Sequence, residues 1–556
     1  RTLTVSDHGC GMSVAEMEEN LGTIAHSGSL QFKQQNDKQD DIDIIGQFGV
    51  GFYAAFMVAS KVEVVSRAQG ADTANRWVSD GADGYTIEPA ERAEVGTDII
   101  LTLMPDSEGD KYSEFLEPYR IQELVKKYSD YIRYPIQMEM PRSRQKEGCD
   151  PEKPEWEEYM ELTTLNSMIP LWRKSKSELK DEDYNQFYKQ KFFDYQDPIH
   201  HIHMYTEGSV TYHALMYIPS HAPMNYYTKD YEKGLALYSN GVLIMDKCAD
   251  LLPDYFSFVR GLVDSADLSL NISRELLQHD RHLKLIAGAL EKKIKNELAS
   301  MMKNKREDYE KFFQAFGLQL KYGAYMDYGM HKDLLQDLLM YHTADSDKML
   351  SLAEYTEQMK EDQKYIYYAC GETKAKIELL PQMERLRDKG YQVLCLTDSI
   401  DEFCMKMMHD YQGKEFKSIS DDDLDLETQD EKEEIETLTK EYQSVLDTMK
   451  QALGEKVTAV QFTSRLKSHP CCLTTKGMLS LEMEKVLNQQ PGQEKIHAER
   501  VLELNAEHPI FQKLKTANQD TLAKYAAVLY AQAQLIEGLP LEDPVAYANT
   551  VCELLV

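Results

Sequence analysis

A short junction near the start of the chain, Ser6–Met12 (SDHGCGM), most constrains what this sequence can fold into. It follows residues 3–5 (LTV), whose apolar–polar alternation predicts a β-strand, and it breaks at once into glycine. A carboxylate at Asp7 would stand at the strand end and accept a hydrogen bond from an exocyclic amine such as adenine N6. Gly9 and Gly11 would let a flat ring or another backbone segment come close. The alternative is a plain turn, because Asp and Gly are common turn residues.

A second glycine cluster, Ile44–Phe56 (IIGQFGVGFYAAF), strengthens the ligand interpretation. Gly46, Gly49 and Gly51 form a loop that leads into an apolar, helix-like segment. Backbone N–H groups at a helix start, unobstructed by side chains, form an anion site. The loop lacks the GK[ST] of a P-loop and follows no buried strand of a βαβ unit, so a dinucleotide site is disfavoured.

Two further segments suit the same pocket. Asn20–Ser29 (NLGTIAHSGS) combines small and hydroxyl residues with two glycines, which is typical of a segment that folds over a bound ligand. Thr97 opens a predicted strand, Gly96–Leu103 (GTDIILTL), and its hydroxyl can bond a base edge or an ordered water beside Asp7.

Taken in this order, the four motifs resemble the nucleotide pocket shared by gyrase-type ATPases, histidine kinases, MutL proteins and the 90-kDa heat-shock chaperones. Three later segments narrow the resemblance to the 90-kDa heat-shock chaperones: 169–175 (IPLWRKS), 239–268 and 270–278 (LNISRELLQ). Within that family the chain is most similar to the bacterial form. The resemblance covers essentially the whole chain. It implies a multidomain α+β fold: an incomplete gyrase/histidine-kinase-like ATP-binding α/β sandwich, an α/β middle domain and a mainly helical C-terminal dimerisation domain.

The resemblance also implies roles for individual residues. Asp7 is similar to the aspartate that binds adenine N6, and Asn20 is similar to the pocket asparagine near the ribose. His26 stands where the family often has a lysine, which puts a charged contact at neutral pH in doubt. The full set of residues expected to bind ATP is Asp7, Gly11, Met12, Asn20, His26, Ser27, Gly46, Gln47, Phe48, Gly49, Val50, Gly51, Phe52 and Thr97.

Two residues of the second domain are implied in catalysis. Arg274 would neutralise the γ-phosphate as an arginine finger does, and Gln278 lies on the same helical face four residues on. Without the resemblance, a surface ion pair between Arg274 and a nearby glutamate would be preferred. The family's general-base glutamate and Mg²⁺-binding asparagine would both lie upstream of Arg1, so we expect the chain as written to lack them and to hold no metal ligand itself.

The length of the chain sets the number of domains that we expect. A length of 556 residues predicts roughly two to four domains. The expected segments are an ATP-binding domain over 1–141, a charged linker over 142–160, a middle domain over 161–418, an acidic connector over 419–436 and a dimerisation domain over 437–556. Within them we predict a strand at 61–67 and a helix at 121–134 that stops before Pro135.

Charge and cysteine content exclude several classes of protein. The formal net charge of −32 disfavours nucleic-acid binding, and no apolar run is long enough for a membrane span. Nine cysteines, an odd number without a CxxC pair, favour a reducing compartment. The resemblance implies the bacterial cytosol, with a mitochondrial relative as the alternative. The histidine cluster at 200–203 has no further ligand nearby, so a metal site is disfavoured.

The C-terminal end carries two apolar stripes. Asp543 as N-cap and Pro544 at the first helical position predict a helix start. The stripes consist of Ala548, Val551, Cys552 and Leu555, and of Leu522, Tyr525, Ala526 and Leu529. They can close the core of their own domain or pair with a second copy, and the resemblance favours a four-helix homodimer interface.

These expectations combine into an ATP-dependent molecular chaperone that clamps client proteins as a homodimer, with ATP and Mg²⁺ as cofactors. Client proteins and chaperone partners are expected, without nucleic acid or membrane. Exposed client contacts are suggested at Tyr226 and Tyr227 and at Met478, Leu479 and Met483, although each set can instead be core packing. The alternatives are an ATP-binding scaffold without turnover, or another ATPase of the same superfamily.

Overall fold

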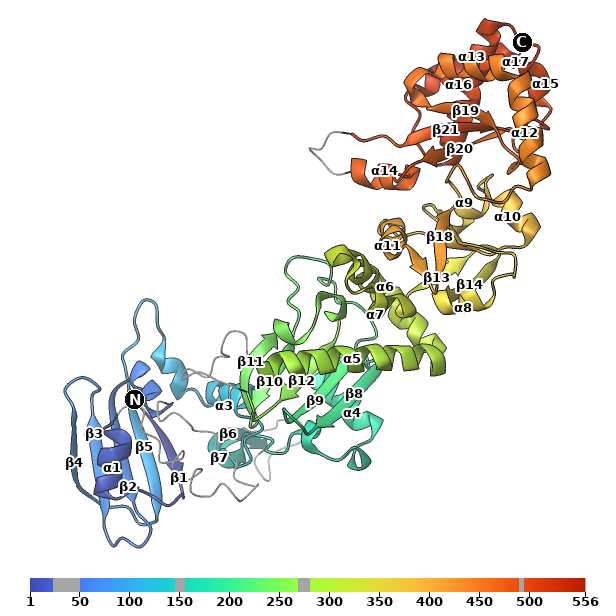
Figure 1. Ribbon diagram of the computed structural model, residues 1–556. Coiled ribbons are helices and arrows are strands. Elements are labelled where there is room, and N and C mark those ends of the chain that lie inside the picture. Colours follow the sequence, from blue (N-terminus) through green and yellow to red (C-terminus); the bar gives the residue numbers. More distant parts are fainter. Residues whose placement is uncertain (24–50, 146–155, 269–280, 490–494, 556) are drawn as a thin grey trace. The chain divides into compact units, whose positions relative to one another are not determined.

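The computed structural model describes residues 1–23, 51–145, 156–268, 281–489 and 495–555 (Figure 1). The chain divides into two compact units, Arg1–Pro253 with Ser257–Lys293, and Asp254–Phe256 with Ile294–Val556. Several separate sheets, each with its own helices, confirm the predicted multidomain α+β class. No helix in the described ranges is both long enough and apolar enough to cross a membrane.

The first sheet follows the N-terminus and has the antiparallel order β1-β5-β2-β3-β4. Its strands are β1 Thr2–Asp7, β2 Ala59–Arg67, β3 Ala74–Ser79, β4 Tyr85–Ala90 and β5 Gly96–Leu103. The predicted strands at 61–67 and 96–103 are therefore confirmed. Helix α1 (Val14–Leu21) begins at a capping box in which Ser13 and Glu16 bond each other's backbone N–H groups.

Helix α1 covers one face of this sheet. The buried side chains of Met17 and Leu21 pack with Val62, Val64 and Leu101 in one hydrophobic cluster. Figure 1 shows α1 lying over the sheet. This covered face is the one that carries the candidate site.

The predicted helix at 121–134 is wrong at its end. Helix α3 spans Pro118–Tyr128 and stops at Ser129. The carbonyl of Asp130 accepts the backbone N–H groups of Ser167 and Met168, both at 2.9 Å. These long-range bonds replace the intrahelical bonds that a continued helix would make, so tertiary contacts override the local pattern.

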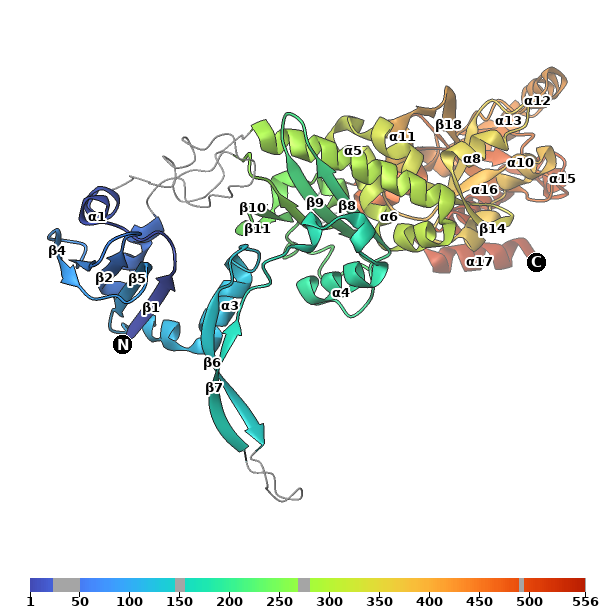
Figure 2. The ribbon, with the colours of Figure 1, turned by 90° about the horizontal axis from the view of Figure 1, so that it is seen from below.

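A two-stranded ribbon occupies part of the stretch predicted to be a charged linker, 142–160. Strands β6 (Gln137–Gln145) and β7 (Trp156–Thr164) pair along their full length (Figure 2). Arg142 bonds Glu161 and Arg144 bonds Glu157 across the ribbon. Such cross-strand ion pairs explain how a charge-rich segment adopts regular structure.

The second sheet of the first unit has the order β11-β10-β12-β9-β8, in which only the β10–β12 pair is parallel. Its strands are β8 His200–Thr206, β9 Tyr212–Ile218, β10 Leu235–Ser239, β11 Val242–Cys248 and β12 Arg260–Asp264. Helix α4 (Asp181–Phe192) packs Tyr184 and Tyr188 against it, together with the fully buried Trp172. Helix α5 (Arg281–Asn304) follows.

The second unit contains a six-stranded mixed sheet of order β14-β13-β16-β15-β18-β17. Its strands are β13 Met340–Thr343, β14 Ser346–Ser351, β15 Ile366–Cys370, β16 Val393–Leu396, β17 Asp410–Tyr411 and β18 Lys414–Ser418. Its helices are α6 Arg306–Gly329, α7 Lys332–Leu335, α8 Leu352–Glu357, α9 Lys374–Glu378, α10 Met383–Lys389 and α11 Asp401–Met408.

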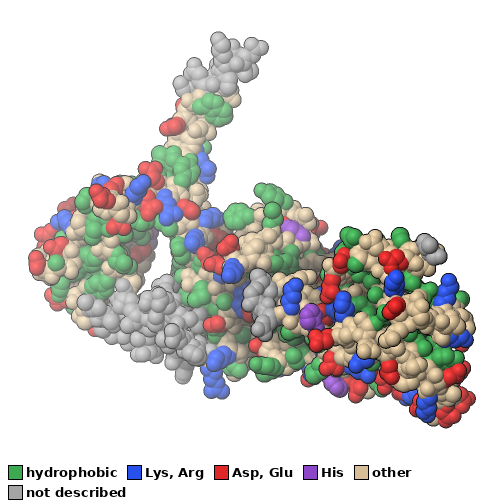
Figure 3. Space-filling model, turned by 90° about the horizontal axis from the view of Figure 1, so that it is seen from above, with side chains coloured by type: hydrophobic (Ala, Val, Ile, Leu, Met, Phe, Trp, Pro, Cys, Tyr) green, Lys and Arg blue, Asp and Glu red, His purple; other side chains and the backbone are tan. Residues whose placement is uncertain are grey.

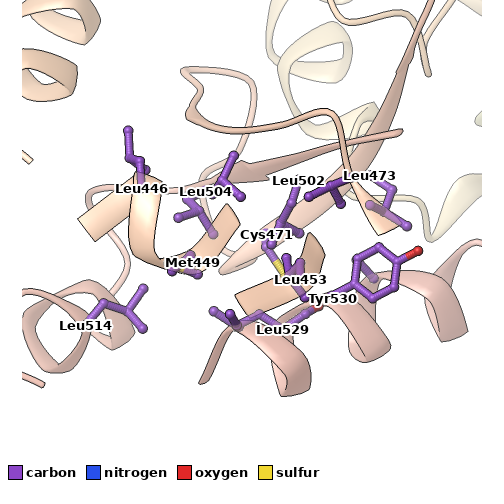
Figure 4. Close-up of a cluster of buried hydrophobic side chains, with 14 of the residues drawn as sticks. Leu446, Met449, Leu453, Cys471, Leu473, Leu502, Leu504, Leu514, Leu529 and Tyr530 are labelled. Carbon is purple, nitrogen blue, oxygen red and sulfur yellow. Dashed lines mark hydrogen bonds between the residues drawn. The ribbon is translucent and has the colours of Figure 1, made fainter. Parts of the chain in front are cut away.

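The C-terminal part packs helices on a three-stranded sheet of order β19-β21-β20. The strands are β19 Ala459–Phe462, β20 Cys471–Lys476 and β21 Glu499–Leu504. The helices are α12 Gln429–Glu441, α13 Gln443–Leu453, α14 Leu481–Asn488, α15 Ile510–Leu514, α16 Gln519–Ile536 and α17 Pro544–Leu555. Side chains of α13 and α16 point toward those of β20 and β21 in one core (Figure 4). The side chain of Asp543 caps α17 by accepting the N–H of Ala546 at 2.8 Å, as predicted.

Candidate functional site

Three polar side chains form a row at one end of the α1-covered sheet face. Asp7 on β1 is the register partner of Thr97 on β5, and Thr97 is the partner of Ser66 on β2. Directly paired residues of antiparallel strands place their side chains on the same face. The neighbours of this row on the same face are the apolar residues Val5, Val64 and Ile99. The face is therefore apolar along the strands and polar at this end.

The hydroxyl groups of Ser66 and Thr97 form a buried pair. Their oxygens lie 2.9 Å apart, and the residues are 0% and 6% exposed. Ser66 Oγ also donates to the carbonyl of Gly96 and accepts the backbone N–H of Met12 at 2.8 Å. Thr97 was predicted as a site residue from its motif, whereas Ser66 was not. A serine that interrupts the apolar alternation of the predicted strand at 61–67 was the available signal.

The carboxylate of Asp7 takes part in a turn and remains exposed. Its Oδ1 accepts the N–H of Gly9 at 2.8 Å, which is the turn geometry given as the alternative interpretation. A carboxylate offers about four acceptor positions, so one turn bond is compatible with a further bond to a ligand amine. The turn and the ligand interpretations therefore do not exclude each other.

Arg92 fixes the main chain at this strand end. Its Nη2 donates to the Asp7 carbonyl at 3.0 Å, and its guanidinium makes two bonds to the Asp98 carboxylate at 3.0 and 3.1 Å. The hydrogen bonds from Arg92 hold the pKa of Asp98 below its ordinary value. Arg92 was not predicted as a site residue, because it lies in a loop with no local pattern.

Two glycines are required here by close backbone packing. Gly11 has φ +67°, and a Cβ at this position would lie 1.9 Å from the carbonyl oxygen of Arg67. Gly96 has φ +133°, and its Cβ would lie 2.1 Å from the carbonyl oxygen of Asp7. The glycines thus let strand ends approach each other, and close backbone approach is one of the two roles predicted for Gly11. Its contact with a ligand stays a prediction.

The remaining described site residues lie on two short elements beside the same face. Asn20 is in the last turn of α1 and is partly exposed. Gly51 begins a 3₁₀ helix, Gly51–Met57, where the sequence predicted an apolar helix start. The ring of Phe52 packs edge-on against Trp77, with centroids 5.6 Å apart, and so belongs to the core of the sheet. Met12 packs against the same core.

Several predicted site residues lie outside the described residues. They are His26, Ser27, Gly46, Gln47, Phe48, Gly49, Val50, Arg274 and Gln278. Their assignments stay predictions.

The described row fits the base end of a nucleotide. It combines a carboxylate acceptor, a buried hydroxyl pair and an adjoining apolar face, which is the mixture expected of a small-molecule site. Among the residues that the structure describes, no group of three His, Cys, Asp or Glu side chains could hold a metal ion. The described residues therefore give no support for a Mg²⁺ position.

Two other motifs have structural explanations. His203 is buried, with Nδ1 2.8 Å from the Tyr184 hydroxyl and Nε2 2.9 Å from the Trp172 carbonyl oxygen. Tyr226 is also buried and bonds Ser257 through its hydroxyl at 2.8 Å, so the packing alternative applies there and not the client contact. Tyr227 is exposed.

Comparison with known proteins identifies the family. The sequence profile described as "Histidine kinase-, DNA gyrase B-, and HSP90-like ATPase" matches residues 1–98, and the profile described as "Hsp90 protein" matches residues 150–556. Proteins named "Chaperone protein HtpG" from Clostridium perfringens (strain ATCC 13124), Oceanobacillus iheyensis and Bacillus subtilis (strain 168) are 55%, 54% and 53% identical over 559 aligned positions. Each alignment covers 100% of this chain and 89% of the relative. The chain therefore belongs to the Hsp90 family.

Proposed function

We propose that this protein is an ATP-dependent molecular chaperone that clamps client proteins as a homodimer. The observation that carries the proposal is the row Asp7–Thr97–Ser66 at the end of an α1-covered sheet, within the segment that matches the ATPase profile. The relatives, which are named chaperones, support the same conclusion.

In this proposal the chain's own residues recognise the base of ATP. The Asp7 carboxylate accepts a hydrogen bond from the exocyclic amine, and the buried Ser66–Thr97 pair holds the strand ends beside it. Bound ATP supplies the phosphoanhydride bond whose hydrolysis drives the chaperone cycle. Arg274 and Gln278 are proposed to stabilise the γ-phosphate. The loop at 46–52 is proposed to bind phosphate oxygens through backbone N–H groups.

The domain division is part of the same proposal. It assigns 1–141 to ATP binding, 161–418 to the middle domain and 437–556 to dimerisation, with connecting segments at 142–160 and 419–436.

Dimerisation is assigned to α17 and not to both C-terminal stripes. Leu522, Ala526 and Leu529 of α16 are buried in the core of their own domain, so this apolar stripe is not exposed for pairing with a second copy. Helix α17 has no buried residue, and Val545 and Leu555 are 70% and 81% exposed. We propose that its exposed apolar side chains pack against the same helix of a second copy.

Clients are proposed to be unfolded or partly folded proteins. Met478 is exposed beside α14, while Leu479 is partly buried against the C-terminal core, so only part of the predicted methionine surface is available. Acidic and basic side chains are interspersed on the face drawn in Figure 3. The formal net charge of −32 is the reason that no nucleic-acid partner is proposed. The eight described cysteines are unpaired, which agrees with a reducing cytoplasm.

An aggregation assay tests the proposal. A test enzyme unfolded in guanidine is diluted in the presence of the protein, and its aggregation is measured by light scattering. The full-length protein should suppress aggregation, and addition of ATP and Mg²⁺ should change the extent of suppression. Asp7→Asn should retain the suppression without ATP and lose the response to ATP. Asp72→Asn, an exposed acid of the same domain, is the matched control. An unchanged response to ATP in Asp7→Asn would refute the assignment of the site.

A further inference from the structure

A small pocket lies in the first unit, outside the row that contains Asp7. Its volume is about 240 Å³, and its walls come from the segment after α3, the segment before α4 and the β10–β11 turn. The residues that matter for its chemistry are Tyr131, Arg133, Tyr134, Ile169 and Arg173. No function described above uses this pocket.

The first wall is fixed by a buried amide. Asn166 accepts the N–H of Ile136 at 2.8 Å, and its Nδ2 donates to the carbonyls of Ile132 at 2.8 Å and Tyr134 at 2.9 Å. The ring of Tyr131 packs edge-on against Trp172, with centroids 4.4 Å apart. The pocket wall is therefore preformed, and little order needs to be created when a ligand binds.

The second wall contains a strained turn. Met168 has φ +60°, and the N–H of Ile169 donates to the carbonyl of Ser167 at 2.7 Å, which closes a three-residue γ-turn with a positive φ. This type of turn is rare for a residue with a side chain. The bonds from the Ser167 and Met168 N–H groups to the Asp130 carbonyl hold it in place. The turn places Ile169 at the pocket with its side chain 66% exposed.

The lining combines apolar walls with positive charge. Arg133 and Arg173 line the pocket, and no Asp or Glu stands among the lining residues that the structure describes. Asp264, which is 1% exposed, accepts hydrogen bonds from Arg173 at 2.9 Å and so orients that guanidinium, while the Arg173 side chain stays 31% exposed. Arg133 lies over the ring of Tyr134, with its guanidinium carbon 5.2 Å from the ring centroid.

We propose that this pocket binds a small aromatic monocarboxylate. The guanidinium groups would bond the carboxylate, as the planar fork of arginine does in general, and the tyrosine rings and Ile169 would contact the aromatic body. The volume is below the range of about 300–1,000 Å³ that drug-sized ligands occupy, so the ligand is limited to about one ring with a short acidic chain.

The test is a titration of 3-phenylpropanoate into the full-length protein, in which binding is measured by saturation-transfer NMR. The matched ligands are 3-phenylpropanamide, which has the same shape without charge, and inorganic phosphate, which has charge without the apolar body. We expect saturable binding of the acid with a Kd of about 1 mM, the affinity usual for a ligand of this size. The amide should bind at least about tenfold more weakly, and phosphate should not displace the acid.

Two variants locate the binding. Arg133→Gln should weaken binding of the acid at least about tenfold, whereas Arg142→Gln on the ribbon, outside the pocket, should leave it unchanged. Because Arg133 also packs on Tyr134, Ile169→Ala provides a second test at an exposed side chain and should weaken binding severalfold. Circular dichroism confirms that each variant is folded. The proposal is overturned if the acid fails to saturate, if acid and amide bind equally, or if folded Arg133→Gln and Ile169→Ala both bind normally.

Discussion

Asp7 and Thr97 face each other across the β1–β5 pair, and the Thr97 hydroxyl lies 2.9 Å from that of Ser66 on the next strand. The position of the acid is therefore set by strand register, and not by a loop alone. Sites held by regular elements keep their geometry better than sites on loops. This relationship leads to predictions for the residues that support Asp7 and for Asp7 itself.

Thr97→Val should weaken the fold slightly and leave the backbone in place. Ser66 Oγ keeps its bonds to the Gly96 carbonyl and the Met12 N–H, so only the hydroxyl pair is lost. We expect a loss of about 1 kcal/mol in the free energy of unfolding, measured by urea denaturation. Thr4→Val, at an exposed position of β1, should change stability less. Equal effects of the two substitutions would contradict the importance of the buried pair.

Gly11→Ala should be far more costly than Gly70→Ala. Both glycines have positive φ, +67° and +81°, so both substitutions introduce strain of about 1 kcal/mol. Only the Cβ at Gly11 meets another backbone, 1.9 Å from the Arg67 carbonyl oxygen, whereas nothing lies within 4 Å at Gly70. The Tm of each variant is compared with that of the wild type. The loss in Gly70→Ala measures the cost of the positive φ, and the additional loss in Gly11→Ala measures the contact of its Cβ with the Arg67 carbonyl. A similar Tm for the two proteins would show that the close approach at Gly11 is unimportant.

Arg92→Gln should lower stability in a pH-dependent way. The bonds from Arg92 depress the pKa of Asp98 in the folded state, so this contribution is present above the ordinary aspartate pKa. It is lost as the pH falls through the depressed value, because the protonated acid no longer pairs with the guanidinium. We expect a loss of about 1 kcal/mol at pH 7 that becomes smaller in acid, where only the bonds of Arg92 to main-chain carbonyls remain to be lost. Denaturation midpoints of wild type and variant that stay equally far apart from pH 7 down to pH 2 would contradict this account.

Substitutions in the two C-terminal helices should have different outcomes. Leu555→Glu and Val545→Glu change exposed side chains of α17, so they should leave the domain folded and convert dimers to monomers. Leu529→Glu places a charge in the domain core and should unfold it. Light scattering with circular dichroism distinguishes the two effects. A folded, dimeric double variant of α17 at micromolar concentration would rule out this interface.

Local patterns predicted much of the fold. Apolar alternation located β2 and β5, and the Asp543–Pro544 pair located the start of α17, because these signals depend on neighbouring residues alone. Long-range bonds were not predictable in this way. The end of α3 depends on Asp130, whose partners lie near residue 167.

The candidate site was predicted in part for the same reason. Asp7 and Thr97 were named from their own motifs, but their pairing with Ser66 depends on the strand order β1-β5-β2, which no single motif encodes. Close approach of another backbone was one of the two roles predicted for Gly11, but its partner, the Arg67 carbonyl, is distant in sequence and no local motif names it. Leu522, Ala526 and Leu529 of α16 follow the helical period, but they pack in the core of their own domain. The helical period shows that one face of a helix is apolar and does not show what covers that face.

The most direct test of the central claim is the calorimetric titration of ADP into the full-length protein and its Asp7→Asn variant. In the variant, the side-chain oxygen is expected to keep the bond to the Gly9 N–H, which would leave the amide NH₂ facing the exocyclic amine as donor against donor. We predict at least about a tenfold loss of ADP affinity, with an unchanged Tm, since Asp7 is exposed. Asp72→Asn should bind ADP normally. An unchanged ADP affinity in folded Asp7→Asn would contradict the assignment of Asp7 to adenine.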